Sequence, residues 1–369
     1  MTTRMAGDKR GKARICVIFG GRSAEHEVSL ASGTSIMEAL DRKRFEVLPL
    51  LVTREGRWML LPRPEASSEE GREVLLPAAP DRASLHFAEG GRAAAVDVFF
   101  PIIHGTFGED GTLQGLLELA GLPFVGSGCA SSAICMDKGV TKAVLRAAGL
   151  PVLPLLTVTR GQWESDRGGV LEEAVAKVGF PLFVKPASLG SSVGVNRVED
   201  SDHLGAAVQD AMEYDIKVLI EEEARGREVE CAVLEGPAVG ELLASPLAEI
   251  RPKSGWYDYK AKYTPGLTEI LIPAPLEETA AEKVRAHARA AFAALGCSGL
   301  ARVDFFYRER SGEIYINEVN TLPGFTPLSG YPKMIEAAGL SYPAMLERLI
   351  ACAFARAEQS RARRFRRPG

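Results

Sequence analysis

The feature that most constrains the fold is an apolar run near the N-terminus that stops at two glycines. Arg14–Phe19 has the composition of a buried strand, and Gly20 and Gly21 provide a turn directly after it. Apolar residues then recur at helical spacing from Val28 to Leu40, which predicts a helix. A buried strand, a glycine turn and a helix in this order are typical of an α/β domain with a parallel sheet.

Further segments extend this unit, so we expect residues 1–126 to form an N-terminal α/β domain. The stretch from Arg54 to Gly91 is rich in Pro, Glu and Gly, which predicts surface hairpins or loops. The other predicted elements are strands at Val47–Thr53 and Val96–Ile103 and a helix at Thr112–Ala120.

Short helices and closely spaced strands follow, which is an α+β pattern. We expect two lobes, at residues 127–222 and 223–369. The first has predicted helices at Asp137–Ala148 and Leu171–Val178 and strands at Leu182–Pro186, Val193–Val198 and Val218–Glu222. The second has strands at Glu228–Leu234, Leu300–Arg308 and Glu313–Val319 and helices at Glu278–Leu295 and Tyr342–Ala357.

Composition narrows the class of protein. The chain has 369 residues, 46% hydrophobic and 25% charged, which suits a soluble protein of two or three domains. A net charge of −4 argues against general nucleic-acid binding, and no apolar run is long enough for a membrane span or a signal peptide. Six cysteines without a CxxC motif indicate reduced thiols in the cytoplasm. Residues 1–14 and the arginine-rich residues 360–369 predict solvated tails or, alternatively, a contact to an acidic partner.

Polar residues gather in the last two predicted strands. Arg302 and Asp304 are two apart and share one face, as do Glu318 and Asn320, and a turn at 310–312 predicts an antiparallel pair. Two carboxylates and an amide are hard oxygen ligands that suit Mg²⁺ shared with phosphates. The alternative is a solvated outer face of the hairpin, which the apolar neighbours Val303, Phe305, Ile316 and Val319 disfavour.

A glycine- and serine-rich loop lies between two predicted strands. Lys185 precedes it, and Gly190 to Gly194 supply the N–H and hydroxyl groups that wrap a phosphate. The loop lacks the GK[ST] sequence and the following helix of a Walker A motif, so it resembles a lid over phosphates. The alternative is an ordinary glycine hairpin.

Residues 126–131 half resemble a dinucleotide-binding fingerprint. Ser131 stands where the third glycine is needed, and no acid follows at the required distance, so a dehydrogenase is disfavoured. Two other residues suit small polar ligands. Glu25 lies at a helix start, where it fits an ammonium or simply stabilises the helix, and His104 follows a strand at its carboxyl end.

Together these segments resemble the D-alanine–D-alanine ligases of the ATP-grasp superfamily. The resemblance runs from Ile15 to Glu347 and rests on GGRSAEHEVSL, HGTFGEDGTLQG, KPASLGSSVG, YDYKAKY, ARVDFF and NEVNTLPGFT. It implies an N-terminal α/β domain followed by a two-lobed ATP-grasp fold that clamps ATP between antiparallel sheets.

The resemblance also assigns residues to the ligands, position by position. Those implied for ATP are Lys138, Lys185, Ser192, Glu221, Ala224, Glu228 and Lys262, and those implied for two Mg²⁺ (or Mn²⁺) are Asp304, Glu318 and Asn320. Those implied for the two D-alanine molecules are Glu25, His104, Arg302, Gly324 and Ser329.

In the family, Arg302 and the Gly324 N–H match the groups that stabilise the oxyanion. Glu25, Ser191 and Tyr263 match a hydrogen-bonded set that links the three domains, with Lys262 and Tyr263 on a loop that closes over the site. Tyr263 favours D-alanine over D-lactate as the second substrate.

The implied activity is ATP-dependent ligation of two D-alanine molecules through an acyl phosphate, for peptidoglycan precursors, by a cytoplasmic homodimer. Two alternatives stay open. One is a D-alanyl-D-lactate ligase or another ATP-grasp carboxylate–amine ligase, and the other is a catalytically silent ATP-binding module.

Overall fold

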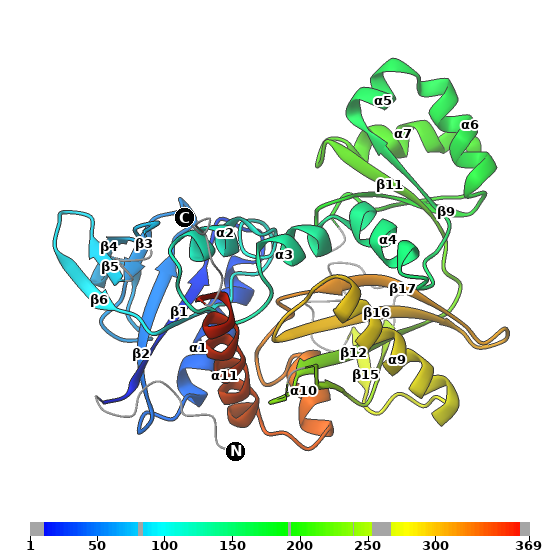
Figure 1. Cartoon of the computed structure of the whole chain (residues 1–369). Coiled ribbons are helices and arrows are strands. Elements are labelled where there is room, and N and C mark those ends of the chain that lie inside the picture. The colour runs from blue at the N-terminus through cyan, green and yellow to red at the C-terminus, as the bar shows by residue number, and fades with distance from the viewer. Residues whose placement is uncertain (1–10, 80–83, 191–192, 239, 253–266, 362–369) are drawn as a thin grey trace, which may run out of the picture.

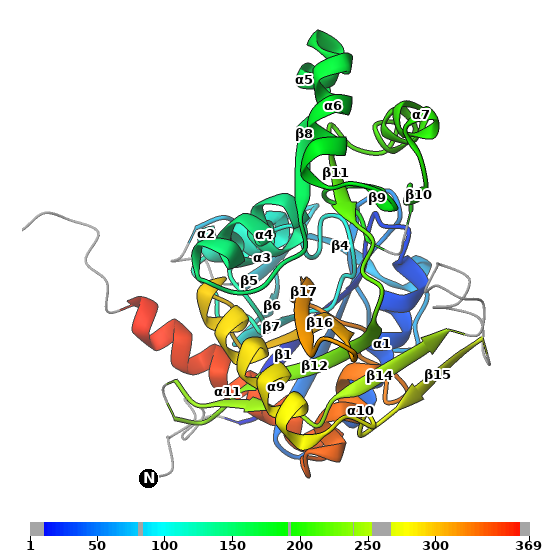
Figure 2. The same ribbon diagram turned by 90° about the vertical axis from the view of Figure 1, so that its right-hand side faces the viewer.

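The structure is a computed structural model that describes residues 11–79, 84–190, 193–238, 240–252 and 267–361. Most of both predicted tails therefore lies outside the described residues. Figure 1 shows an N-terminal sheet beside a C-terminal lobe, with a smaller central lobe projecting above them. Figure 2 shows the same projection from the side, with α5 and α6 at its tip.

The N-terminal sheet combines a parallel part with an antiparallel extension. The predicted parallel strands are confirmed, since β1 lies between β2 and β7 and is parallel to both. The region from Arg54 to Ala95 contributes short antiparallel strands that continue this sheet beyond β2 in the order β6-β5-β4-β3-β2. The elements are β1 Ala13–Gly20, α1 His26–Ala39, β2 Phe45–Val52, β3 Trp58–Leu60, β4 Arg72–Leu75, β5 Ser84–Phe87, β6 Arg92–Ala95, β7 Val98–Pro101 and α2 Thr112–Leu119.

The next segment begins with two helices and continues into an antiparallel sheet of order β10-β9-β11-β8. Side-chain caps set the helix starts, because Asp137 accepts from the Val140 N–H at α4 and Asp166 accepts from the Gly169 N–H at α6. The elements are α3 Cys129–Met136, α4 Lys138–Ala147, β8 Leu155–Thr159, α5 Arg160–Ser165, α6 Arg167–Lys177, β9 Leu182–Pro186, β10 Asn196–Val198, α7 Ser201–Ala211 and β11 Lys217–Glu222.

The C-terminal lobe is built on an antiparallel sheet of order β15-β14-β12-β16-β17, with β13 paired to β12. Helix α9 packs its apolar face, including Val284 and Phe292, against this sheet. The elements are β12 Arg227–Glu235, β13 Leu242–Ala244, β14 Ala248–Pro252, β15 Thr268–Leu271, α9 Glu278–Ala294, β16 Leu300–Arg308, β17 Glu313–Asn320, α10 Gly330–Ala337 and α11 Tyr342–Arg361.

The hydrophobic clusters show which parts of the molecule pack together into one core. One buried cluster joins β1 and β7 to α10 and α11, and at its centre the Phe325 ring contacts Phe100, Tyr331 and Tyr342. The projecting part, β8 to β11, has a cluster of its own. Helices α3 and α4 place Cys135 and Leu145 in the cluster of the C-terminal lobe. The boundaries at 126 and 222 stay predictions.

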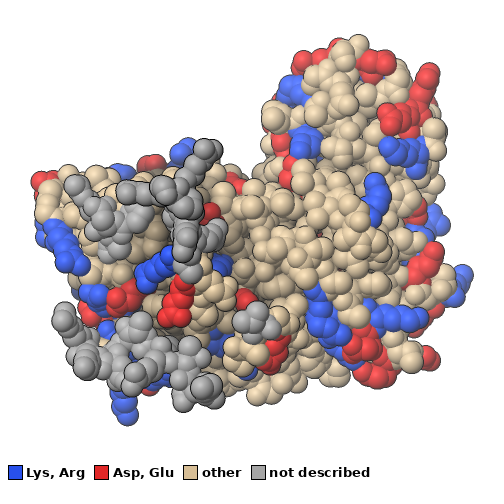
Figure 3. All heavy atoms as spheres, viewed as in Figure 1, with Lys and Arg blue, Asp and Glu red and all other residues tan. Residues whose placement is uncertain are grey.

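The surface mixes both signs of charge. On the face shown in Figure 3, Lys and Arg side chains alternate with Asp and Glu, and the molecule is hollowed beside the projecting lobe. None of the helices in the described part of the chain combines the length and apolar character that a bilayer crossing requires.

Arg356 ties the last helix to the end of the N-terminal domain. Its guanidinium donates to the carbonyl of Gly126 and, over 2.6 Å, to that of Phe124, and it lies 4.4 Å from the Phe124 ring centre. Burial lowers the pKa of Arg356. Because a guanidinium stays protonated in proteins, the two buried carbonyls receive a charged donor.

We predict that Arg356→Met lowers the free energy of unfolding by about 2 kcal/mol, because both carbonyls lose a charged hydrogen-bond donor. Chemical denaturation followed by circular dichroism measures the change. Arg361→Met, an exposed change on the same helix, is the matched control. Equal stability of the two variants would contradict the prediction.

Candidate active site

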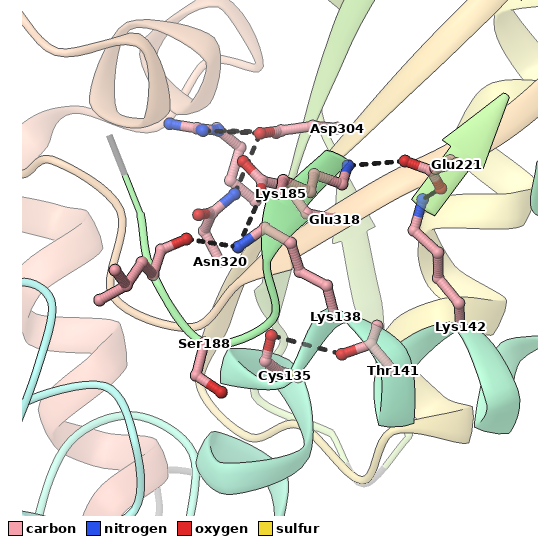
Figure 4. A network of polar contacts seen from close by, with 12 residues as sticks. Cys135, Lys138, Thr141, Lys142, Lys185, Ser188, Glu221, Asp304, Glu318 and Asn320 are labelled. Carbon is pink, nitrogen blue, oxygen red and sulfur yellow. Dashed lines mark hydrogen bonds and ion pairs between the residues drawn. The ribbon is translucent and has the colours of Figure 1, made fainter. Parts of the chain in front are cut away.

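The last two strands of the C-terminal sheet carry the predicted metal ligands. Strands β16 and β17 are antiparallel, as predicted, with Asp304 opposite Glu318 and Arg302 opposite Asn320. Arg302 donates to both oxygens of Asp304 over 2.7 Å each, and Asn320 Nδ2 donates to Asp304 Oδ2 over 3.0 Å. The four side chains therefore meet on one face of the hairpin (Figure 4).

The donor set fits a hard divalent cation that also binds phosphate. Within the described ranges no three or more His, Cys, Asp or Glu side chains form a metal cage. Two carboxylates and one amide nevertheless lie side by side, and Mg²⁺ typically takes one or two carboxylates and completes its shell with water and phosphate oxygens. Lys138 Nζ, 3.5 Å from Glu318, partly balances the negative charge.

Glu230 is a neighbour that the sequence reasoning missed. It lies opposite Asp304 on β12, and its Oε1 is 3.4 Å from Arg302 Nε. Burial alone would lower the pKa of Arg302, but Asp304 and Glu230 raise it well above its ordinary value. The sequence could have indicated Glu230, because it stands two residues after Glu228 in a predicted strand and so lies on the same face of the sheet.

A cavity of about 270 Å³ opens between the central and C-terminal sheets. It brings together most residues that the resemblance implied for ATP. Lining it are Lys138, Lys185, Glu221, Ala224 and Glu228, together with Arg302, Asp304 and Glu318. Ser192 and Lys262, also implied for ATP, lie outside the described residues.

Behind this cavity, one carboxylate joins two lysines. Lys185 Nζ lies 2.6 Å from Glu221 Oε2, and Lys142 donates to Glu221 Oε1 (Figure 4). Burial raises the pKa of Glu221, but the two lysines outweigh it and hold that pKa below its usual value. Burial lowers the pKa of Lys142 to about 8. The sequence reasoning missed Lys142, although it stands one helical turn after Lys138.

Lys138 connects helix α4 to the segment that follows Lys185. Its backbone N–H donates to the Ala187 carbonyl over 3.0 Å, and its ammonium donates to the Leu189 carbonyl over 2.8 Å. The side chain therefore lies between the loop that begins after Lys185 and the carboxylate of Glu318. Such a position suits a cation that contacts phosphates.

A second cavity, of about 560 Å³, continues from the first. Lys138, Gly190, Arg302 and Glu318 line both. The second cavity also contains the remaining described residues that the resemblance implied for substrate. They are Glu25, His104, Gly324 and Ser329, with Asn320 beside them. Ser191 and Tyr263 lie outside the described residues.

His104 links the N-terminal sheet to the loop that follows β17. Its Nδ1 donates to the Leu322 carbonyl over 2.9 Å, and its Nε2 lies 2.9 Å from Ser32 Oγ, which also accepts from the Phe325 N–H. Burial alone would lower the pKa of His104, but Glu109 and Glu25 raise it. Ser32 and Glu109 were missed, although Glu109 belongs to the same glycine-rich turn as His104.

Gly324 and Ser329 lie close together at the start of α10. Ser329 Oγ accepts from the Thr326 N–H over 3.2 Å, and a side chain at Gly324 would come within 3.1 Å of that hydroxyl. Glycine at this position therefore keeps the backbone accessible to a small ligand. Both residues line the cavity next to Arg302.

Comparisons with known proteins agree with this geometry. The family described as D-ala D-ala ligase N-terminus matches residues 14–127, and D-ala D-ala ligase C-terminus matches residues 144–351. The chain is 45% identical to D-alanine–D-alanine ligase A of Bradyrhizobium diazoefficiens, over 94% of this chain and 96% of that protein. It is also 45% identical to the D-alanine–D-alanine ligase of Deinococcus radiodurans, over 92% and 98% respectively.

Solved structures show the same similarity. The D-alanine–D-alanine ligase of Coxiella burnetii superimposes with a TM-score of 0.83 at 37% identity, covering 95% of this chain and 96% of that one. The VanG D-Ala:D-Ser ligase of Enterococcus faecalis gives 0.83 at 38% identity, covering 93% and 99%. Both the sequence and the fold thus place this chain in the D-alanine–D-alanine ligase family.

Proposed function

We propose that this protein joins two D-alanine molecules into D-alanyl-D-alanine, converting ATP to ADP and phosphate, and so supplies peptidoglycan precursors. The continuity of the two cavities carries this proposal. The cavity with Lys138 and Lys185 suits a polyphosphate, and it meets the cavity with Glu25 at Arg302 and Glu318. A carboxylate and a phosphate can therefore react where the cavities join.

In the first step, the carboxylate of one D-alanine attacks the γ-phosphate of ATP and forms an acyl phosphate. Lys138 and Lys185 bind the phosphates, and Ala224, Glu228 and Glu221 surround the nucleoside side of the cavity. Glu25 pairs with the ammonium of this D-alanine, and His104 fixes the surrounding loop. Positioning and charge neutralisation are the main contributions a protein makes to phosphoryl transfer.

Asp304, Glu318 and Asn320 would hold two Mg²⁺ (or Mn²⁺), which neutralise phosphate charge when bound. The donor set described above supports this assignment. The roles inferred for Ser191, Ser192, Lys262 and Tyr263 rest on the family resemblance alone. The same resemblance leads us to infer a cytoplasmic homodimer.

In the second step, the amine of the other D-alanine attacks the acyl carbon and phosphate leaves. The Arg302 guanidinium and the Gly324 N–H would stabilise the oxyanion that forms. Ser329 would bind the carboxylate of the second D-alanine. Because Asp304 and Glu230 both pair with Arg302, its charge is in place before the oxyanion develops.

A coupled assay of ADP release tests the proposed function. D-Alanine should support ADP release and dipeptide formation, and L-alanine should not. D-Serine and D-lactate, offered in competition with D-alanine over a range of pH, should be poor second substrates. A protein that makes no dipeptide from D-alanine would contradict the proposal.

We predict that Glu318→Gln lowers D-alanine-dependent phosphate release by a factor of roughly 10² or more, because the hairpin loses half of its negative charge toward the cation. Glu313→Gln, on the same strand but exposed and paired with Ser311, is the matched control. Near-normal turnover in Glu318→Gln would remove this residue from the site.

Chelation provides an independent test of the metal assignment. EDTA should abolish turnover, and Mg²⁺ or Mn²⁺ in excess should restore it, because the phosphates would otherwise meet Asp304 and Glu318 without a cation between them. Full turnover in metal-free buffer would contradict the assignment, whatever the effect of Glu318→Gln.

We predict that Arg302→Lys reduces kcat by roughly 10², because a lysine cannot both pair with Asp304 and reach the oxyanion. The KM for ATP should change little, and circular dichroism should match the wild type. Lysine keeps a positive charge beside Asp304 and Glu230, so the variant tests the geometry of the guanidinium and not its charge. A kcat within a fewfold of wild type would argue against the oxyanion role.

A further inference from the structure

We propose that Lys142 is a positioning residue for ATP: it holds the carboxylate of Glu221 so that the Lys185 ammonium stays available to the phosphates. The inference rests on the proposed use of the first cavity for ATP. It gives a role to a buried charge that the mechanism above does not use.

The geometry is a row of three charges. Lys142 donates to one oxygen of Glu221, and Lys185 lies 2.6 Å from the other. Figure 4 shows the two lysines reaching the carboxylate from different directions, each at its own oxygen. Lys185 and Glu221 line the cavity and Lys142 does not. Two ammonium groups and one carboxylate leave the row with a net positive charge, and its Lys185 end faces the cavity.

Burial excludes Lys142 as a direct ligand. Its exposed fraction is 0% and that of Glu221 is 2%. Lys138, one turn earlier on α4, lines both cavities, whereas Lys142 lines neither. Residues four apart share one side of a helix. Helix α4 therefore presents one lysine to the cavity and a second lysine to the carboxylate behind it.

A lysine in this position is costly unless it is paired, since a buried ammonium loses its hydration. Burial accordingly lowers its pKa to about 8, while Glu221 opposes that shift. Without Lys142, the whole charge of Glu221 would act on Lys185. The resulting neutral pair would attract phosphate less than the row of three charges does.

The ion pair of Lys142 and Glu221 also connects two parts of the molecule that have separate hydrophobic cores. Helix α4 contributes Leu145 to the core of the C-terminal lobe, whereas β11 contributes Val218 and Ile220 to the core of the projecting lobe. Lys142 and Glu221 thus join the two surfaces between which ATP would bind. A purely stabilising ion pair would affect all substrates equally, and this difference is the basis of the test.

Lys142→Met should raise the KM for ATP about tenfold, the size expected for a lost charge-assisted contact, and leave the KM for D-alanine within twofold. Calorimetric titration with a non-hydrolysable ATP analogue and Mg²⁺, without D-alanine, should show the same loss of affinity. This binding readout does not require ligation, so it tests Lys142 even if the proposed function fails. Lys177→Met, an exposed lysine of the projecting lobe paired with Glu173, is the control.

The double variant Lys142→Met/Glu221→Gln distinguishes a positioning role of Lys142 from a role in protein stability alone. Because Glu221 itself lines the proposed ATP cavity, the reference for the double variant is Glu221→Gln alone. Once the carboxylate charge is gone, removing Lys142 should cost no further affinity, so these two variants should bind ATP within about threefold of each other. The double variant buries no unpaired charge, so it serves even if Lys142→Met alone does not fold. The proposal is overturned if Lys142→Met weakens both substrates equally, if it leaves ATP affinity unchanged, or if the double variant binds ATP tenfold more weakly than Glu221→Gln.

Discussion

The candidate site depends on the way Arg302 is held between two carboxylates. Strand β16 lies between β12 and β17, and this order places Glu230, Asp304 and Glu318 on adjacent strands at one level of the sheet. Three acids so close together are tolerated because Arg302 and Lys138 compensate them. The same compensation keeps a fixed positive charge next to a cation site, which is the combination that phosphoryl and acyl transfer need at one place.

The candidate site also depends on a rigid connection between the N-terminal sheet and the C-terminal helices. The Phe325 ring lies in a core shared by the N-terminal sheet and the C-terminal helices, and its backbone N–H donates to Ser32. Gly324, whose N–H is the proposed oxyanion donor, directly precedes Phe325. It is therefore fixed to both the N-terminal sheet and the C-terminal helices. The Glu25 side of the second cavity and the hairpin with the proposed metal ligands therefore keep their spacing without help from the projecting lobe. That lobe has its own core, and its sheet forms the opposite wall of the cavity proposed for ATP.

Much of this could be predicted from the sequence. Strands β9 and β16 match their predicted limits, and the face shared by Arg302 and Asp304 follows from a spacing of two residues. Helix α6 begins earlier than predicted, because Asp166 caps it before its apolar positions begin. The stretch from Arg54 to Gly91 was predicted as hairpins or loops without individual strands, because strands of three or four residues are too short to show a clear periodicity. Lys142 was missed for another reason: Glu221 lies 79 positions away, and only the tertiary fold brings them together.

The buried pair of Lys142 and Glu221 also has a consequence for the motions open to the projecting lobe. A buried charge left without its partner costs about 3–5 kcal/mol, so a motion of the lobe that separates this pair is disfavoured by about that amount. A motion that keeps the pair intact would be a rotation about it, in which the displacement grows with distance from the pair. In such a rotation α5 and α6, at the tip of the projecting lobe, would be displaced most, and Lys185, 2.6 Å from Glu221, would be displaced least. The lysine proposed to bind phosphate would then keep its position while the outer end of the lobe moves.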